Sequence, residues 1–160
     1  MSAPGGSRPT NVPEPSFDAL YRDLILDHYR APHGRQPLAR EDVVTEGMNP
    51  ICGDEVDVAL QEDGGRLTGV RVASRGCAIS VSSGSMLHDI VAGLTPDEAR
   101  RRIAAVKATF QGAEVPSDVD LGDFDALEGV KQFPVRIKCA LLPWTTLDQA
   151  LRELDAKERR

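Results

Sequence analysis

The chain has 160 residues, which is long enough for one domain with a proper hydrophobic core. Its 19 basic and 25 acidic residues give a formal net charge of -6, and only 4% of its residues are aromatic. An acidic chain with few aromatic side chains neither attracts a phosphate backbone nor offers a platform for stacking bases, so nucleic acid is excluded as an expected partner. No apolar run approaches the roughly 18 residues that a membrane-spanning helix needs, so no membrane association is expected.

The cysteine count and the N-terminal sequence together indicate the cellular compartment. Three cysteines cannot all pair, and the N-terminus lacks a basic region followed by an apolar stretch. We therefore expect reduced thiols and a cytoplasmic protein rather than a secreted disulfide framework.

The composition changes at both ends of the chain. Residues 1–15 contain four prolines together with glycines and serines, so they cannot bury enough apolar surface to order themselves. We expect a disordered tail at 1–15, a single domain at 16–155 and a charged tail at 156–160. The charged stretch from Asp148 onward is expected to fray.

The first ordered element is predicted to be a helix that begins at Phe17, with Ser16 as its cap, and ends near Pro32. Apolar residues recur along it at the i, i+3, i+4 spacing of one buried stripe. The stripe comprises Phe17, Leu20, Tyr21, Leu24, Ile25 and His28.

An antiparallel sheet is predicted next. Residues 43–44 begin a strand, residues 56–60 alternate between apolar and polar, and residues 67–72 form the returning strand. The sequence Asp63-Gly64-Gly65 between the last two is typical of a hairpin turn. The first loop of this sheet would carry Cys52, and its last strand would lead to Cys77.

Helices are predicted for the rest of the chain, at 79–91, from a capping box at Thr95-Pro96-Asp97-Glu98 to 110, and from Pro134 onward. Residues 111–123 read as a loop, and 124–127 as a short helical turn. Pro143 removes an N–H that would pair with the carbonyl of Cys139, so we expect a kink or a break beside Cys139.

The three cysteines and one carboxylate are the candidate site. Cys52, Asp54, Cys77 and Cys139 supply three sulfurs and one oxygen, which suits a tetrahedral zinc ion. Gly53 gives the backbone freedom to turn Cys52 and Asp54 inward. Buried free cysteines that merely pack as small hydrophobes are the alternative, and without a CxxC pair the spacing alone does not choose between the two.

The negative charge of the proposed ligand set needs a nearby cation, and Arg136 is the candidate. Three thiolates and one carboxylate leave a net charge of about minus two around zinc, and Arg136 lies one helical turn before Cys139. We expect its guanidinium to hydrogen-bond Asp54 or a thiolate, although it could equally be an ordinary surface residue. His28, His33 and His88 are expected to have ordinary packing or surface roles.

Several motifs together resemble the SufU proteins of the IscU-like (NifU N-terminal) scaffold family. The resemblance runs from about residue 17 to residue 149 and includes all three cysteines. The motifs are residues 20–29 (LYRDLILDHY), 49–54 (NPICGD), 76–80 (GCAIS), 121–123 (LGD), 127–130 (LEGV) and 133–140 (FPVRIKCA).

The resemblance implies an α+β fold, with a three-stranded antiparallel sheet and helices packed against it. It also implies a zinc ion bound by the residues matching Cys52, Asp54, Cys77 and Cys139. A protein of this kind would be a zinc-dependent sulfurtransferase that takes persulfide sulfur from a SufS-type cysteine desulfurase, with Cys52 as the acceptor. The sulfur would pass to downstream SUF proteins for iron–sulfur cluster assembly.

Two alternatives accompany this expectation. The same ligands could assemble a [2Fe–2S] cluster, or zinc could be structural in an adaptor domain. Lys138 stands immediately before Cys139, where IscU-like scaffolds carry histidine. This difference, with the insertion around 111–123, favours the SufU branch.

Overall fold

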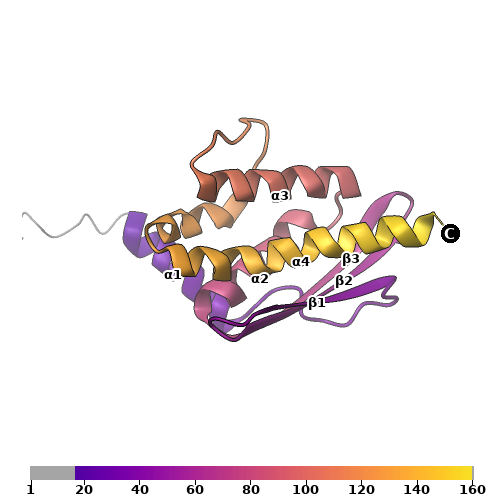
Figure 1. Cartoon of the computed structure of the whole chain (residues 1–160), viewed down its shortest axis with the longest axis horizontal. Coiled ribbons are helices and arrows are strands. Elements are labelled where there is room, and N and C mark those ends of the chain that lie inside the picture. The colour runs from indigo at the N-terminus through magenta and orange to yellow at the C-terminus, as the bar shows by residue number, and fades with distance from the viewer. Residues whose placement is uncertain (1–16, 160) are drawn as a thin grey trace, which may run out of the picture.

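The computed structural model describes residues 17–159, with side chains from Tyr21 onward, and has the α+β fold predicted from the sequence. The expected disordered tail and the Ser16 cap lie outside the described residues. The elements follow in the order α1 (Phe17–Arg30), β1 (Val43–Asn49), β2 (Asp54–Asp63), β3 (Arg66–Arg75), α2 (Ala78–Val91), α3 (Pro96–Gln111), the 3-10 helix η1 (Gly122–Gln132) and α4 (Pro134–Glu158) (Figure 1).

The three strands form an antiparallel sheet in the order β1-β2-β3, which confirms the predicted hairpin. Asn49 pairs with Asp54 across the β1–β2 turn, and Asp63 pairs with Arg66 across the hairpin. The β1–β2 turn and the last residues of β3 therefore lie at one end of the sheet, because Glu55 pairs with Arg75. This register brings Cys52 and Cys77 to the same end.

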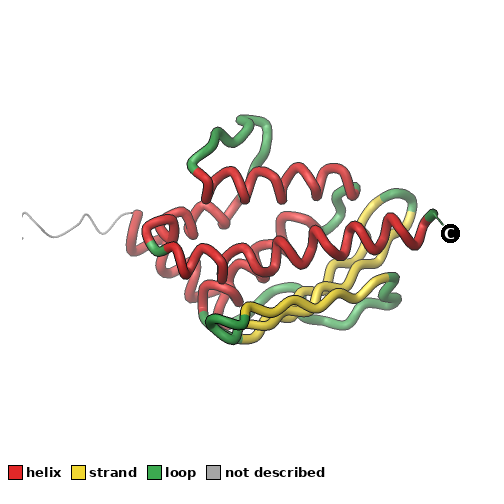
Figure 2. Tube along the Cα trace, in the orientation of Figure 1, coloured by secondary structure: helices red, strands yellow, loops and turns green. Residues whose placement is uncertain are grey.

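The helices cover one face of the sheet. Helix α4 packs on β1 and β2, α2 packs on β3 and on α4, and α3 lies farther out against α4. Figure 2 shows the strands along one side of the molecule and the helices gathered on the other. The core between them contains Val56, Val58 and Leu60 of β2 and Trp144 and Leu147 of α4, all fully buried.

Helix α2 is joined to α4 by hydrogen bonds of the buried Ser83. Ser83 Oγ donates to the carbonyl of Ala140 at 2.6 Å and accepts from the indole Nε1 of Trp144 at 3.1 Å. The sequence explains the small residues of α2 only by close packing. The structure adds that Ser83 supplies hydrogen bonds to the α4 turn that carries Cys139.

Helix α4 corrects two expectations. It continues without a break through the buried Pro143, so the expectation of a break beside Cys139 is wrong, and the alternative expectation, a kink there, stays a prediction. The predicted fraying after Asp148 is also wrong, since the helix extends to Glu158. Leu151 and Leu154 are buried there, and Thr45 of β1 donates to Glu153 at 2.6 Å, so the sheet holds this charged stretch in helical form.

The capping box of α3 and the helical turn near residue 124 were both predicted from the sequence, but the turn is longer than expected. The capping box of Thr95 and Glu98 is present at the start of α3. The short turn expected at 124–127 is a longer 3-10 helix, η1, in which Phe124 and Leu127 are buried. Within residues 17–159, none of the helices combines the length and the apolar character needed to cross a membrane.

Candidate metal centre

Cys52 lies in the tight turn between β1 and β2, and its side chain is exposed. Asn49 closes the turn: its carbonyl accepts from the amide of Gly53 at 2.8 Å, and its side-chain oxygen accepts from the amide of Ile51 at 3.1 Å. Gly53 has a φ of 74°, as its predicted role requires. Cys52 is therefore presented on an exposed turn whose base is fixed by hydrogen bonds.

Asp54 is the first residue of β2 and is fully buried. Its Oδ1 accepts from the backbone amide of Cys77 at 2.9 Å. Gly76 makes this approach possible, because a Cβ at that position would stand 2.0 Å from Oδ1 of Asp54. Gly76 also has a φ of 134°, a value that other residues rarely adopt. The pair Gly76-Cys77 was visible in the sequence, but the need for glycine there follows only from the β2–β3 register.

Cys77 is the N-cap of α2, with extended backbone angles, and its sulfur accepts from the amide of Ser80 at 3.4 Å. The free amides at the start of a helix carry partial positive charge. The α2 N-terminus thus directs amide N–H groups toward both the sulfur of Cys77 and the carboxylate of Asp54.

Cys139 is buried on α4 and completes the group. Its sulfur lies 3.2 Å from that of Cys52. Asp54 Oδ2 lies 3.0 Å from the sulfur of Cys52 and 3.4 Å from that of Cys77. Donor atoms of Cys52, Asp54 and Cys139 all lie within 4.8 Å of one another. The structure therefore brings Cys52, Asp54 and Cys139 into one group, and Cys77 adjoins this group through Asp54.

The electrostatics of this group differ between the thiols and the carboxylate. Burial raises the pKa of Cys139, and the hydrogen bonds with Cys52 and Asp54 raise it further. Burial is also the main reason that the pKa of Cys77 is raised. Burial alone would raise the pKa of Asp54, but hydrogen bonds from the Cys77 amide and the thiols outweigh it and lower that pKa. Without metal, the half-buried thiol of Cys77 and the buried thiol of Cys139 hold their protons beside an ionised Asp54.

The donor set fits a zinc ion. Tetrahedral zinc with sulfur at about 2.3 Å and oxygen at about 2.0 Å separates its ligand atoms by about 3.5–3.8 Å. The sulfur–sulfur and sulfur–oxygen separations from 3.0 to 3.4 Å are slightly shorter than that. For these three pairs, the ligand atoms would need to move apart by only a few tenths of an ångström, and Cys52 lies on an exposed turn. The sulfur of Cys77, which lies outside the group of Cys52, Asp54 and Cys139, would have to move toward that group.

Arg136 lies on the first turn of α4 and is exposed. Its side chain lines a hollow of about 330 Å³ with Ile25, Ile79, Val130 and Phe133, among others. Between residues 17 and 159, no hydrogen bond or ion pair is recorded that joins Arg136 to Asp54 or to a thiol. The role expected for Arg136 therefore stays a prediction, and the amides of α2 are the positive groups that contact the centre.

Exposed apolar side chains surround the centre. The exposed fractions are 62% for Met48, 68% for Ile51, 59% for Phe133 and 59% for Val135. A second hollow, of about 400 Å³, lies between the Cys52 turn and α4, where Met48, Ile51 and Lys138 contribute to its lining. Sequence reasoning missed this rim, because isolated apolar residues near turns carry no periodic signal.

Comparisons with known proteins agree with this geometry. The sequence profile of the NifU-like N terminal domain matches residues 20–140. The zinc-dependent sulfurtransferase SufU of Bacillus subtilis is 35% identical over 85% of this chain and 92% of its own length. The iron–sulfur cluster assembly scaffold protein IscU of Streptococcus pyogenes is also 35% identical, over 83% of each chain.

Solved structures show the same fold. A crystal structure from Fervidobacterium islandicum AW-1, described as a candidate iron–sulfur cluster assembly scaffold protein for the SUF system, has a TM-score of 0.75 at 32% identity and covers 81% of this chain and 94% of that one. The N-terminal part of a NifU-like protein from Brucella abortus has a TM-score of 0.78 at 25% identity, over 88% and 97% of the two chains. With its profile match, its relatives and its fold in agreement, this chain belongs to the family of NifU-like N-terminal domains.

Proposed function

We propose that this protein is a zinc-dependent sulfurtransferase that accepts persulfide sulfur from a SufS-type cysteine desulfurase in the cytoplasm and passes it to iron–sulfur cluster assembly. One observation carries the proposal: an exposed cysteine on a glycine turn lies against a second thiol and a buried carboxylate, and that carboxylate also contacts a third thiol. The name of the Bacillus relative, a zinc-dependent sulfurtransferase, supports it.

Cys52, Asp54, Cys77 and Cys139 would hold the zinc. When bound, zinc would keep the thiols deprotonated and would lower the nucleophilicity of each bound sulfur until it is released. Asp54, Cys77 and Cys139 are the fixed members, since they come from a strand, a helix cap and a helix. Cys52 is the movable member, because it lies on a turn and is exposed.

The transfer step requires only Cys52 and the desulfurase persulfide. The Cys52 thiolate attacks the outer sulfur of that persulfide, and a new sulfur–sulfur bond forms on Cys52. The sulfur–sulfur bond of the donor breaks, and the desulfurase cysteine leaves as a thiolate. No external oxidant or reductant is needed, because the outer sulfur moves between two thiolates at the same oxidation level.

The apolar rim is suited to the docking of this partner. Met48 and Ile51 on one side of the centre and Phe133 and Val135 near the other side are all more than half exposed. Contact with a partner would bury them around Cys52 and exclude water from the transfer. The desulfurase would thus meet the sulfur acceptor at the centre of its own interface.

A scaffold for a [2Fe–2S] cluster is the second candidate function. The Streptococcus relative is named an iron–sulfur cluster assembly scaffold protein, and its 35% identity to this chain equals that of the Bacillus relative. Thiolates bind iron–sulfur clusters as readily as zinc. Anaerobic purification separates the two candidates, since a scaffold would retain iron and sulfide and the proposed transferase would retain zinc.

The deciding experiment measures turnover of the cognate cysteine desulfurase with and without the zinc-loaded protein. We expect strong stimulation that Cys52→Ala abolishes, while Gln149→Ala, an exposed change on α4 outside the hollow beside the Cys52 turn, leaves it intact. Zinc content and circular dichroism of each variant verify that loading and folding are retained. Full sulfur acceptance by Cys52→Ala would disprove the proposed role of Cys52, and no stimulation by a well-folded zinc protein would favour the scaffold or a structural zinc.

A further inference from the structure

A second group of metal-binding side chains lies away from the cysteine centre. It consists of His28 near the end of α1, His33 in the turn that follows, and Asp89 near the end of α2. Asp89 is 12 residues after Cys77 along α2, a distance of about 18 Å at the rise of an α-helix. This group therefore shares no ligand with the cysteine centre.

The three side chains converge on one point. One donor atom from each of His28, His33 and Asp89 lies within 4.8 Å of the other two. His33 Nδ1 stands 2.7 Å from Oδ2 of Asp89, and the two imidazole rings have their centroids 4.8 Å apart. A carboxylate of η1 adjoins the group, because His28 Nε2 lies 3.0 Å from Oδ2 of Asp123.

The hydroxyl group of Ser85 contacts both histidines. Its hydroxyl oxygen accepts from the backbone amide of His33 at 2.8 Å and lies 2.6 Å from Nδ1 of His28. A histidine that binds a metal through one nitrogen commonly donates its other N–H to a neighbouring oxygen. With Nδ1–H of His28 donated to Ser85, Nε2 would present its lone pair on the side of Asp123.

The group is open to solvent on one side and acidic. His28 is buried, but the side chains of His33, Asp89 and Asp123 are each about half exposed. A hollow of about 410 Å³ adjoins them, and Asp89, Asp120, Asp123 and Arg102 contribute to its lining. Three carboxylates against one guanidinium favour a cation, and the hollow has room for an ion with its remaining water ligands.

We propose that His28, His33 and Asp89, with Asp123 beside them, form a second site for a divalent transition-metal ion. Imidazole and carboxylate donors without sulfur select ions such as Zn²⁺, Co²⁺, Ni²⁺ or Fe²⁺ over softer ions that need thiolates. The ion would join α1, the turn after it and α2. By binding the folded state alone, it would also raise the stability of this end of the molecule.

The test uses the full chain with its cysteine centre already loaded with zinc. Co²⁺ is added and followed by calorimetry and by visible absorbance, because cobalt bound to nitrogen and oxygen lacks the intense thiolate charge-transfer bands that displacement of zinc would produce. We expect a saturable binding event without thiolate bands. His33→Asn and Asp89→Asn should each weaken it by about 10-fold or more.

A matched control neutralises a carboxylate near the site that is not one of the proposed ligands. Asp27→Asn neutralises an exposed carboxylate directly before His28 in sequence, and it should leave Co²⁺ binding unchanged. Both ligand variants alter half-exposed side chains, so folding should persist, and circular dichroism verifies that it does. The proposal is overturned if zinc-loaded protein binds Co²⁺ only with thiolate bands, if it binds none, or if His33→Asn and Asp89→Asn bind it as tightly as the parent.

Discussion

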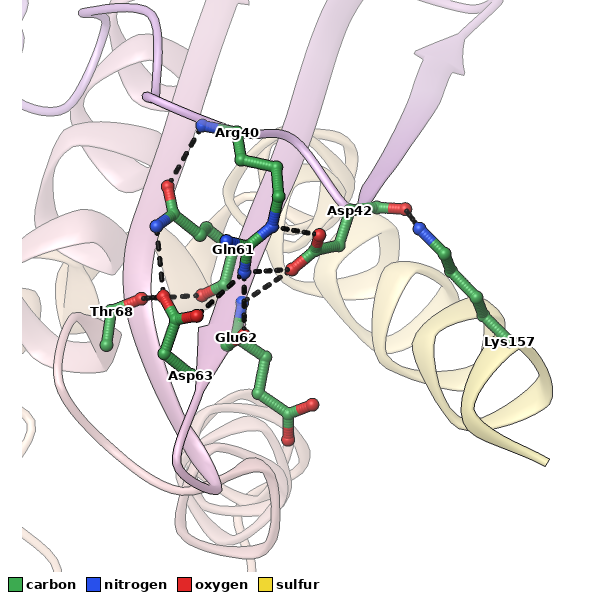
Figure 3. A network of polar contacts seen from close by, with 7 residues as sticks. All are labelled: Arg40, Asp42, Gln61, Glu62, Asp63, Thr68 and Lys157. Atoms are coloured by element: carbon green, nitrogen blue, oxygen red, sulfur yellow. Dashed lines mark hydrogen bonds and ion pairs between the residues drawn. The ribbon is translucent and has the colours of Figure 1, made fainter. Parts of the chain in front are cut away.

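The two ends of the β-sheet are built from opposite kinds of polar contact. At the hairpin end, Arg40 donates to Asp42 at 2.6 Å and to Asp63 at 2.9 Å. Gln61 and Thr68 also donate to Asp63, at 3.0 and 2.8 Å. Figure 3 shows this network, which reaches α4 through a hydrogen bond from Lys157 to the carbonyl of Asp42.

At the cysteine end, the corresponding carboxylate has no cationic side chain recorded against it within residues 17–159. Asp54 receives hydrogen bonds from one amide and from thiols. The hairpin carboxylates are thus satisfied by a guanidinium, whereas the oxygen of Asp54 and three sulfur atoms could all serve as ligands for a cation. Arg75 lies at the same end, but its guanidinium pairs with Glu55 at 3.0 Å. The difference teaches that the hairpin end serves the fold, whereas the cysteine end, within the described part of the chain, keeps its buried carboxylate free of cationic side chains and therefore available to a bound cation.

Gly76→Ala should break the cysteine end most severely. The added Cβ would stand 2.0 Å from Oδ1 of Asp54, on a backbone with a φ of 134°. We expect a loss of about 1–3 kcal/mol in the free energy of unfolding from backbone strain. Zinc affinity should fall by about 10–100-fold or more as Asp54 is displaced. Urea unfolding and competition with a chromophoric chelator measure the two effects.

Gly129→Ala is the control for that change, since a Cβ at Gly129 meets no other atom within 4 Å. It should alter neither stability nor zinc affinity appreciably. If Gly76→Ala bound zinc as tightly as the parent, the close approach of Gly76 to Asp54 would have no part in forming the site.

Ser83→Ala should loosen the joint between α2 and α4 that supports Cys139. The change leaves the buried indole N–H of Trp144 without its partner and removes the donor to the Ala140 carbonyl. An unsatisfied buried group of this kind costs about 1–3 kcal/mol, which urea unfolding can resolve. Thr145→Ala removes an exposed hydroxyl that also bonds a carbonyl of α4, and it should cost clearly less. Equal losses in the two variants would mean that Ser83 has no special role in the joint.

The pH dependence of the metal-free protein should reveal the buried thiols. Burial raises the pKa of Cys139 and Cys77 above the unfolded value, so their contribution to stability is complete below about pH 8.5. It is lost as pH rises above that value, because the unfolded chain then releases protons that the folded chain retains. Urea unfolding from about pH 7 to about pH 10 measures the loss.

Two comparisons sharpen this pH experiment. Cys139→Ala should flatten the alkaline decline, since the thiol responsible is gone. The zinc-loaded protein should respond in the opposite direction and lose its metal on acidification, because protons compete with zinc for thiolates. A metal-free protein whose stability is constant up to about pH 10 would show that Cys77 and Cys139 ionise as readily in the folded chain as in the unfolded one.

The sequence predicts the sheet well, because alternation and turn signals are local patterns. The four residues of the candidate site can also be named from the sequence, but their role as ligands stays a prediction. Alternation at 56–60 and the turn at Asp63-Gly64-Gly65 define the hairpin, and the hairpin brings Cys52 and Cys77 to one end. The position of Arg136 could not be predicted, since helical spacing places it one turn from Cys139 without saying which neighbours surround its guanidinium. The continuity of α4 past Pro143 was also missed, because packing of Trp144 and Leu147 on the sheet outweighs one lost hydrogen bond.

The histidine group was missed for a related reason. His28 and His33 looked like ordinary residues because their partners, Ser85, Asp89 and Asp123, are more than fifty positions away in the chain. No local spacing signals such a cluster. It arises only when α1, α2 and η1 pack together.

Arg40→Ala should have the smallest effect on stability, and it tests the polar network at the hairpin end of the sheet. Its guanidinium is half exposed, and exposed ion pairs contribute little to stability and are screened by salt. Hydrogen bonds from Gln61 and Thr68, followed by that from Arg40, lower the pKa of Asp63 to about 2. The contribution of this carboxylate is therefore present above about pH 4 and lost as pH falls toward 2.

Thermal unfolding of parent and variant should differ slightly at neutral pH and low salt, and the difference should shrink in high salt or near pH 2. Zinc affinity should be the same in both, and a loss of zinc binding in Arg40→Ala would show that the two ends of the sheet are coupled rather than independent.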